Sequence, residues 1–265
     1  MVDVHTIRGD LRLVGSALIT LAALATVGQA DIVNLTTAGS SGVINGAEFR
    51  QADIAPAGSG KLDSFVRIGG DPDKDSSGKA VVEGYNTSAR PLYYDENKSP
   101  TFTHDLLLST VPIVQLTAGG AFYYEFILDI NQRHSDPLLS LDSIQFFQRA
   151  TAIPDSVPVG AGLGTLIYDM DTGGDNWIKL NYSLEAGSGE GDMYAYIPTS
   201  EFNPAIPYVY LYSQFGFQGG ELINNDGYEE WAVRGAGGPV VPLPGAVVLG
   251  MLGMGAAGWR LRRLA

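Results

Sequence analysis

The sequence predicts an all-β fold, an antiparallel β-sandwich of jelly-roll-like type, with an N-terminal signal helix and a C-terminal hydrophobic helix. Three observations support this prediction. Apolar and polar residues alternate over several short segments, which is the period of a strand. Glycine accounts for 34 of 265 residues, nearly twice the usual share of about 7%. No apolar stripe of helical period lies between the two ends of the chain, so short strands joined by turns are expected.

The first 30 residues have the features of a secretory signal peptide. Arg8 and Arg12 precede an uncharged, mainly apolar run at 13–27, and Ala30 is a small residue of the kind that a signal peptidase reads. We predict cleavage after Ala30 and a mature protein that starts at Asp31. The alternative is an uncleaved membrane anchor.

The exported domain is predicted to span residues 31–234. Its first part is polar and interrupted by glycine, and apolar bursts at 42–49 and 64–70 favour strands over amphipathic helices. The clearest alternation lies at 121–130, where every second residue from Phe122 to Ile130 is apolar. Further strands are predicted at 139–147, 177–184, 192–197, 208–213 and 229–234. Such alternation is typical of antiparallel sheets with one solvated side.

Charge and cysteine content limit the classes of partner. Residues 31–234 hold 27 acidic and 11 basic side chains, a net charge of −16. This field repels phosphate backbones and anionic headgroups, so nucleic acid is not an expected partner. Cysteine is absent, so the exported domain must be stabilised by packing, backbone pairing or bound ions rather than by disulfides.

After a glycine-rich linker at 235–240, the last 25 residues, 241–265, have three parts in order. The motif Val241-Pro242-Leu243-Pro244 is followed by the uncharged run 245–259 and then by three arginines, Arg260, Arg262 and Arg263. A membrane crossing takes about 20 apolar residues, so this run is short for a permanent anchor. The arginines favour a cytoplasmic C-terminus with the preceding domain outside. The alternatives are an ordinary single-pass anchor and a buried core helix.

This segment resembles the sorting signal of bacterial PEP-CTERM proteins, which a membrane-embedded exosortase reads and is thought to cut near the proline motif. The resemblance implies that Val241, Pro242, Leu243 and Pro244 form the processing motif and that the arginines form a cytoplasmic retention element. Leu243 stands where the common motif has Glu and matches a Val-Pro-Leu-Pro variant. The segments 99–109, 125–132, 191–198 and 227–232 also resemble exported PEP-CTERM proteins of environmental bacteria, planctomycetes in particular. That likeness implies a β-rich surface or matrix protein.

One acidic loop is a candidate Ca²⁺ site. Asp71, Asp73 and Asp75 have the spacing that places three oxygen ligands around Ca²⁺. Ser76 and Val82 stand where an EF-hand needs Gly and a bidentate Glu. The loop is therefore either a solvated acidic turn or a Ca²⁺ loop of another type. Ca²⁺ is the one cofactor that the sequence suggests.

A tyrosine stripe at Tyr208, Tyr210 and Tyr212 is a candidate surface for stacking on sugar rings, because tyrosine offers flat apolar area with a polar tip. The hypothesis requires Val209 and Leu211 to face the core and the tyrosines to face solvent. If the tyrosines pack inside the protein, they are structural.

Sequence motifs for catalysis are missing. Nucleophile-elbow, zinc-protease and phosphate-loop patterns do not occur, and only His104 and His134 follow the signal peptide. Carboxylates are abundant, so a glycosidase pair remains an alternative. An enzyme is not predicted.

The sequence thus predicts an exported cell-surface or extracellular-matrix protein with a structural or adhesive role, transiently held in the membrane by its C-terminal segment. Signal peptidase and an exosortase-type enzyme are the predicted processing partners, and extracellular polysaccharide is a candidate ligand. The alternatives are a Ca²⁺-dependent carbohydrate-binding module and a glycoside hydrolase.

Overall fold

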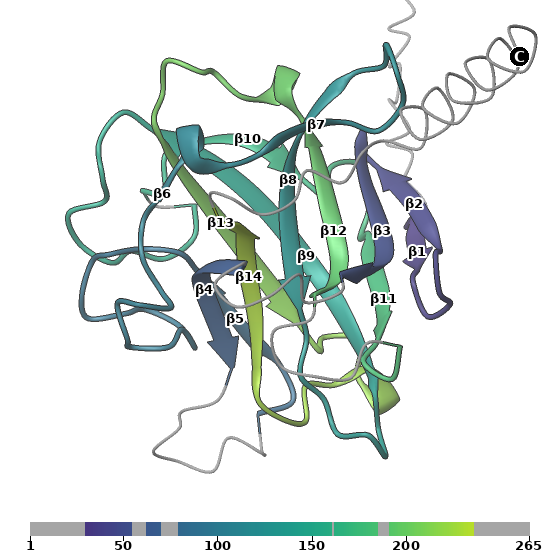
Figure 1. The fold of residues 1–265 in the computed structure, drawn as a ribbon. Helices are drawn as coiled ribbons and strands as arrows, with labels where there is room; N and C mark the ends of the chain where they lie inside the picture. The colour runs from purple at the N-terminus through teal and green to yellow at the C-terminus, as the bar shows by residue number, and fades with distance from the viewer. Residues whose placement is uncertain (1–29, 55–61, 70–78, 161, 185–190, 236–265) are drawn as a thin grey trace, which may run out of the picture.

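A computed structural model describes residues 30–54, 62–69, 79–160, 162–184 and 191–235. Within these residues the chain forms two seven-stranded sheets and three short 3-10 turns, η1 (Leu108–Thr110), η2 (Thr199–Glu201) and η3 (Gly220–Leu222). Figure 1 shows the sheets stacked as a sandwich, with β8, β12 and β3 in front and β9 and β13 behind. The predicted all-β sandwich is confirmed.

The first sheet, sheet A, has its strands in the order β1 (Ile32–Asn34), β11 (Trp177–Asn181), β9 (Leu138–Arg149), β13 (Tyr208–Phe215) and β5 (Val82–Tyr85); β10 (Thr165–Asp169) also pairs with β9, and β6 (Leu106–Leu107) with β13. The pair β1–β11 is parallel, and the other described pairs are antiparallel. The sheet is therefore mixed, whereas the sequence predicted antiparallel pairing throughout.

The second sheet, sheet B, has the order β2 (Ser41–Ile44), β3 (Ala47–Ile54), β12 (Gly191–Pro198), β8 (Phe122–Asp129), β14 (Tyr228–Arg234) and β4 (Leu62–Gly69); β7 (Ile113–Gln115) also pairs with β8. The β2–β3 hairpin turns at Asn45-Gly46, both with positive φ. This dipeptide suits a two-residue hairpin turn because Asn and Gly tolerate that conformation.

The main core lies between the sheets. Its largest fully buried side chains include Trp231, Phe49, Phe65, Phe126 and Phe146. The Nε1 of Trp231, on β14, donates to the Oγ of Ser213, on β13, at 2.9 Å, and both residues are 0% exposed. The indole N–H therefore finds its acceptor across the sandwich, as a buried polar group must.

The prediction of one solvated side per sheet holds for β11 but not for β8. In β11, Ile178 and Leu180 are buried while Lys179 and Asn181 are half-buried. In β8, both faces are buried from Tyr124 onward, and the outward-facing Glu125 is only 2% exposed. Alternating residue types therefore marked the two faces of β8 without revealing that both are covered.

Candidate functional site

Several predicted site residues lie outside the described residues. These are the processing motif at 241–244, the arginines at 260, 262 and 263, and the acidic loop with Asp71, Asp73 and Asp75. Within the described ranges, no group of three or more His, Cys, Asp or Glu residues could hold a metal ion. The same residues contain no helix long and apolar enough to span a membrane. The Ca²⁺ and sorting predictions therefore stay predictions.

The fold begins next to the predicted signal cleavage site. The backbone N–H of Asp31 donates to Oδ1 of the buried Asn176 at 2.7 Å, and β1 starts one residue later. Trp177 N–H in turn donates to the carbonyl of Asp31 at 3.2 Å. The predicted cleavage after Ala30 would therefore leave one residue, Asp31, before the chain enters sheet A.

Two of the three residues of the tyrosine stripe are buried, which favours the structural alternative over an exposed stacking surface. Val209 and Leu211 do face the core between the sheets, as the hypothesis required. However, Tyr210 is 0% exposed and Tyr212 8% exposed, while Tyr208 is half-buried. The outer face of sheet A carries a second apolar cluster there, formed by Tyr85, Phe147, Ile153, Leu163, Tyr210 and Tyr212.

Hydrogen bonds from tyrosine hydroxyls hold the covering loop in place. The OH of Tyr85 accepts from the N–H of Val157 and donates to its carbonyl, both at 2.9 Å. The OH of Tyr210 accepts from Ile153 N–H at 2.9 Å and donates to Oδ1 of Asp105 at 3.1 Å. Burial raises the pKa of Tyr85 and Tyr210. These two tyrosines therefore support the covering loop at Ile153 and Val157.

Beyond this covered part, the outer face of sheet A carries a strip of half-buried polar side chains. Cross-strand register places Glu83 of β5 opposite Gln214 of β13, and Gln214 opposite Ser143 of β9. The neighbouring row runs from Tyr212 to Gln145 and on to Asp169 of β10. We call Glu83, Gln214, Ser143, Gln145, Asp169 and Asp171 the polar strip; all six are half-buried.

The side chains of the polar strip hold one another. Gln145 Nε2 donates to Oδ2 of Asp169 at 2.9 Å. Glu83 accepts hydrogen bonds from the Tyr212 hydroxyl and from Gln214 Nε2. Adjacent strands are about 4.8 Å apart, so the strip crosses four strands over roughly 15 Å. It presents carboxylate oxygens, amides and a hydroxyl in fixed positions.

Asp171 at the end of the strip has a perturbed pKa. Burial, together with the charge of Asp169, raises the pKa of Asp171 to about 6, although a hydrogen bond from Asn176 N–H opposes the rise. Its side chain also bonds to Ser143. One end of the strip therefore changes charge in mildly acidic solution.

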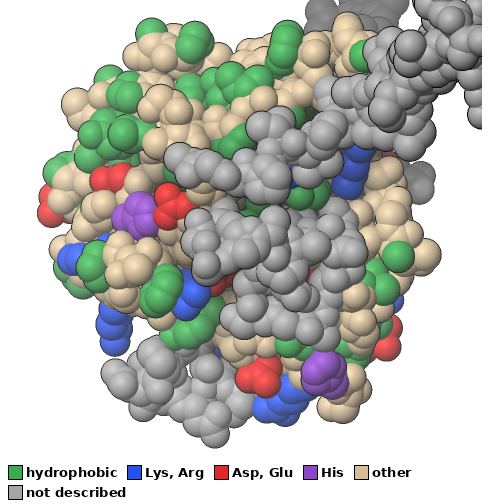
Figure 2. All heavy atoms as spheres, viewed as in Figure 1, with side chains coloured by type: hydrophobic (Ala, Val, Ile, Leu, Met, Phe, Trp, Pro, Cys, Tyr) green, Lys and Arg blue, Asp and Glu red, His purple; other side chains and the backbone are tan. Residues whose placement is uncertain are grey.

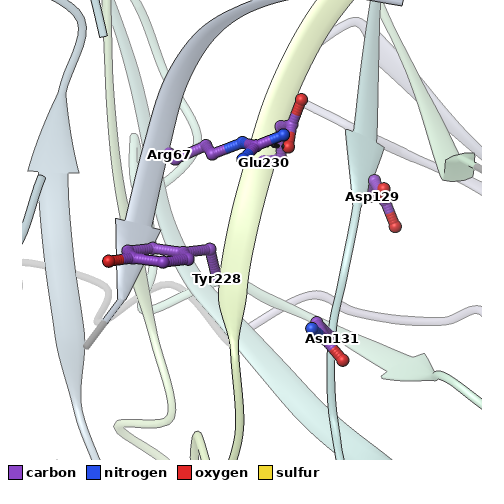
Figure 3. A pocket seen from close by; sticks show the side chains of 5 residues that line it. All are labelled: Arg67, Asp129, Asn131, Tyr228 and Glu230. Carbon is purple, nitrogen blue, oxygen red and sulfur yellow. Dashed lines mark ion pairs between the residues drawn. The ribbon is translucent and has the colours of Figure 1, made fainter. Parts of the chain in front are cut away.

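A pocket of about 60 Å³ lies on the outer face of sheet B and is lined by Arg67, Asp129, Asn131, Tyr228 and Glu230. Figure 3 shows Arg67 of β4 paired with Glu230 of β14, while Asp129 lies on the adjacent β8. Ligand pockets usually have about 300 Å³ or more, so this one suits water or a small ion. Its two carboxylates belong to Asp129 and Glu230, which are directly opposite each other in the register of β8 and β14.

The same sheet face carries an ion pair between a buried glutamate and a half-buried arginine at the end of β14. Arg234 Nε lies 2.6 Å from Glu125 Oε1, and Nη2 of Arg234 donates to the Tyr194 hydroxyl at 2.9 Å. Burial raises the pKa of Glu125 even though Arg234 acts in the opposite direction. Arg234 thus connects the end of β14 to β8 and β12, one residue before the described chain ends.

The upper end of this face is apolar. Figure 2 shows hydrophobic side chains gathered along the upper part of the molecule, where β7 and η2 lie in Figure 1. Ile113 of β7 is 55% exposed and Phe122 of β8 is 53% exposed. Exposed apolar residues of this kind are common on protein surfaces, so we assign this end no binding role.

Sequence reasoning missed the polar strip. Ser143 and Gln145 lie in a predicted strand, and their alternation with apolar neighbours was the available signal. Their partners Glu83 and Asp169 lie in β5 and β10, which were not predicted. Comparison of the chain with protein-family models, curated proteins and solved structures found no match.

Proposed function

We propose that this is an exported structural or adhesive protein of the cell surface or extracellular matrix, sorted through its C-terminal segment by an exosortase-type enzyme. The observation that carries the proposal is the order of parts in the last 25 residues: a proline motif, an uncharged glycine-rich run and three arginines. The PEP-CTERM resemblance of these parts, and the signal-peptide pattern of the first 30 residues, support it.

The position of the sandwich is compatible with processing at both ends. Its first strand starts at Ile32 and its last ends at Arg234. Cleavage after Ala30 and near Pro242 would therefore leave all the strands that the structure describes in the product. Five of the longer strands, β8, β9, β12, β13 and β14, alternate between the two sheets, whereas β3 and β4 both lie in sheet B. The alternation of the five supports the jelly-roll-like arrangement that we propose for the sandwich.

The sorting proposal is tested by replacing Arg260, Arg262 and Arg263 with neutral residues. We expect the variant to lose retention at the membrane and to show a changed mature mass, because the positive charges orient and hold the C-terminus in the cytoplasm. Intact-mass spectrometry and cell fractionation report mass and location. Replacement of Arg133 and Arg149, which lie within the exported domain, is the control and should leave processing intact. Unchanged mass and location in the triple variant would defeat the proposal.

Two alternatives receive less support from the geometry. The Ca²⁺-dependent carbohydrate module relied on the acidic loop, which lies outside the described residues, and on tyrosines that are covered. The glycoside hydrolase requires two carboxylates across a cleft, and the pocket with Asp129 and Glu230 is too small for that arrangement.

A further inference from the structure

We propose that the polar strip on the outer face of sheet A binds a neutral, hydroxyl-rich polysaccharide chain. The inference rests on the adhesive role proposed above and assigns that role to a surface. The proposed sugar-binding surface is therefore the polar strip and not the neighbouring tyrosine stripe of β13.

The strip has the chemistry that sugar hydroxyls require. A hydroxyl group both donates and accepts, so it is best met by a mixture of acceptors and donors. Glu83 and Asp169 supply carboxylate oxygens, while Gln214 and Gln145 supply amides between them on adjacent strands. Because Gln145 is bonded to Asp169 and Gln214 to Glu83, binding needs little reordering of side chains.

Aromatic side chains border this polar floor. On the β5 side, the Tyr94 ring lies 6.0 Å from Tyr212 and 4.8 Å from Tyr93, and Tyr93 is 52% exposed. Tyr93 thus offers an exposed ring near this edge of the strip, and such a ring provides the apolar contact that the face of a sugar ring needs.

The negative charge of the strip determines which class of polysaccharide can bind there. Asp169, Asp171 and Glu83 give the strip an acidic character, and residues 31–234 carry a net charge of −16. An anionic polysaccharide would be repelled. A purely cationic partner would pair with the carboxylates but would not need the amides and the hydroxyl of the strip. The hydroxyl groups of a neutral glycan can form hydrogen bonds with carboxylates, amides and hydroxyl alike.

The test is affinity gel electrophoresis of the full chain, as purified from the producing cells, in gels that contain hydroxyethyl cellulose, xyloglucan or dextran. We expect at least one neutral polymer to retard the protein, with and without a chelator. The double variant Gln145→Ala/Gln214→Ala should bind about tenfold more weakly, as expected for the loss of two hydrogen-bonding groups. Tyr93→Ala should also weaken binding.

Matched controls come from sheet B. Phe122→Ala removes an aromatic ring that is 53% exposed, close to the 52% of Tyr93, and Gln115→Ala removes an amide from β7. Both should leave binding unchanged. Circular dichroism of each variant checks that the fold is retained.

Four results would overturn the inference: no retardation by any neutral polymer, equal effects of strip and control variants, retardation only by alginate or polylysine, or loss of binding in chelator. The last would place binding at an ion site instead. None of these results bears on sorting, which the arginine variant tests separately in cells.

Discussion

At the scale of single residues, the side chain of one buried asparagine forms hydrogen bonds with the backbone of β13 that a neighbouring strand would otherwise form. Asn86 follows β5 and is 0% exposed. Its Nδ2 donates to the carbonyl of Val209 at 2.9 Å, and its Oδ1 accepts from the N–H of Leu211 at 2.6 Å. β5 pairs with β13 up to Tyr85, and β6 takes over at Leu106. The Asn86 side chain therefore satisfies the backbone of β13 between its two partner strands.

Replacement of Asn86 by Ala should lower the free energy of unfolding by about 2–4 kcal/mol, because it leaves a buried N–H and a buried carbonyl without partners. Urea denaturation followed by tryptophan fluorescence measures the change. The control is Asn181→Ala, whose side chain accepts one bond from Ser183 N–H in an exposed turn and should cost less than about 1 kcal/mol. Equal losses in the two variants would contradict this account of Asn86.

At the scale of secondary-structure elements, a short segment joins the edges of the two sheets. Residues 95–97 lie between β5 of sheet A and β4 of sheet B: Asp95 N–H donates to the Glu83 carbonyl, and Asn97 N–H donates to the Arg67 carbonyl. Between them, the carboxylate of Glu96 accepts from the N–H groups of Tyr85 at 3.1 Å and Tyr94 at 2.8 Å. The sandwich is thereby closed along this edge.

We predict that Glu96→Gln destabilises the domain by about 1–3 kcal/mol at neutral pH, because the amide NH₂ would face one of the two N–H donors and leave it unpaired. Thermal or urea unfolding of the purified variant measures the loss. Glu221→Gln is the matched control: the Glu221 side chain is 66% exposed and pairs with Lys179, and surface pairs of this kind contribute about 0–1 kcal/mol. A neutral Glu96→Gln change would show that the segment does not depend on both bonds.

At the scale of the whole molecule, the folded domain contains several carboxyl groups that are buried or half-buried. Burial is the first cause of a raised pKa in five of them: Glu96, Glu125, Asp142, Asp171 and Glu229. A carboxyl with a raised pKa holds its proton more tightly in the folded chain than in the unfolded chain. Its contribution therefore favours folding at low pH and is lost as pH rises through the folded pKa.

The free energy of unfolding should accordingly be larger near pH 5 than near pH 7. For Asp171 the loss falls between its ordinary pKa of 3.8 and its raised value of about 6, and self-repulsion of the acidic domain acts in the same direction. Urea denaturation across this pH range provides the measurement. Asp171→Asn should flatten part of the slope, and a stability that rises steadily from pH 4 to pH 7 would refute the prediction.

Tertiary structure accounts for most of what the sequence missed. Alternation located β8, β9, β12, β13 and β14, since a period of two is local information. It did not locate β1 and β5, which are only 3 and 4 residues long, or β10, in which Leu166, Ile167 and Tyr168 are consecutive apolar residues and show no period of two. Two of these short strands, β5 and β10, supply Glu83 and Asp169 of the polar strip.

The sequence by itself determined the β-rich character of the domain, its acidic charge and the order of the two terminal segments on which the sorting proposal rests. Only the tertiary structure decided which strand faces are covered and which polar side chains meet. The physical reason is that alternation separates the two faces of a strand but does not say what packs on each. Tyr212 and Gln145 alternate with apolar neighbours in the same way. Tyr212 is nevertheless buried in the second apolar cluster, whereas Gln145 is half-buried.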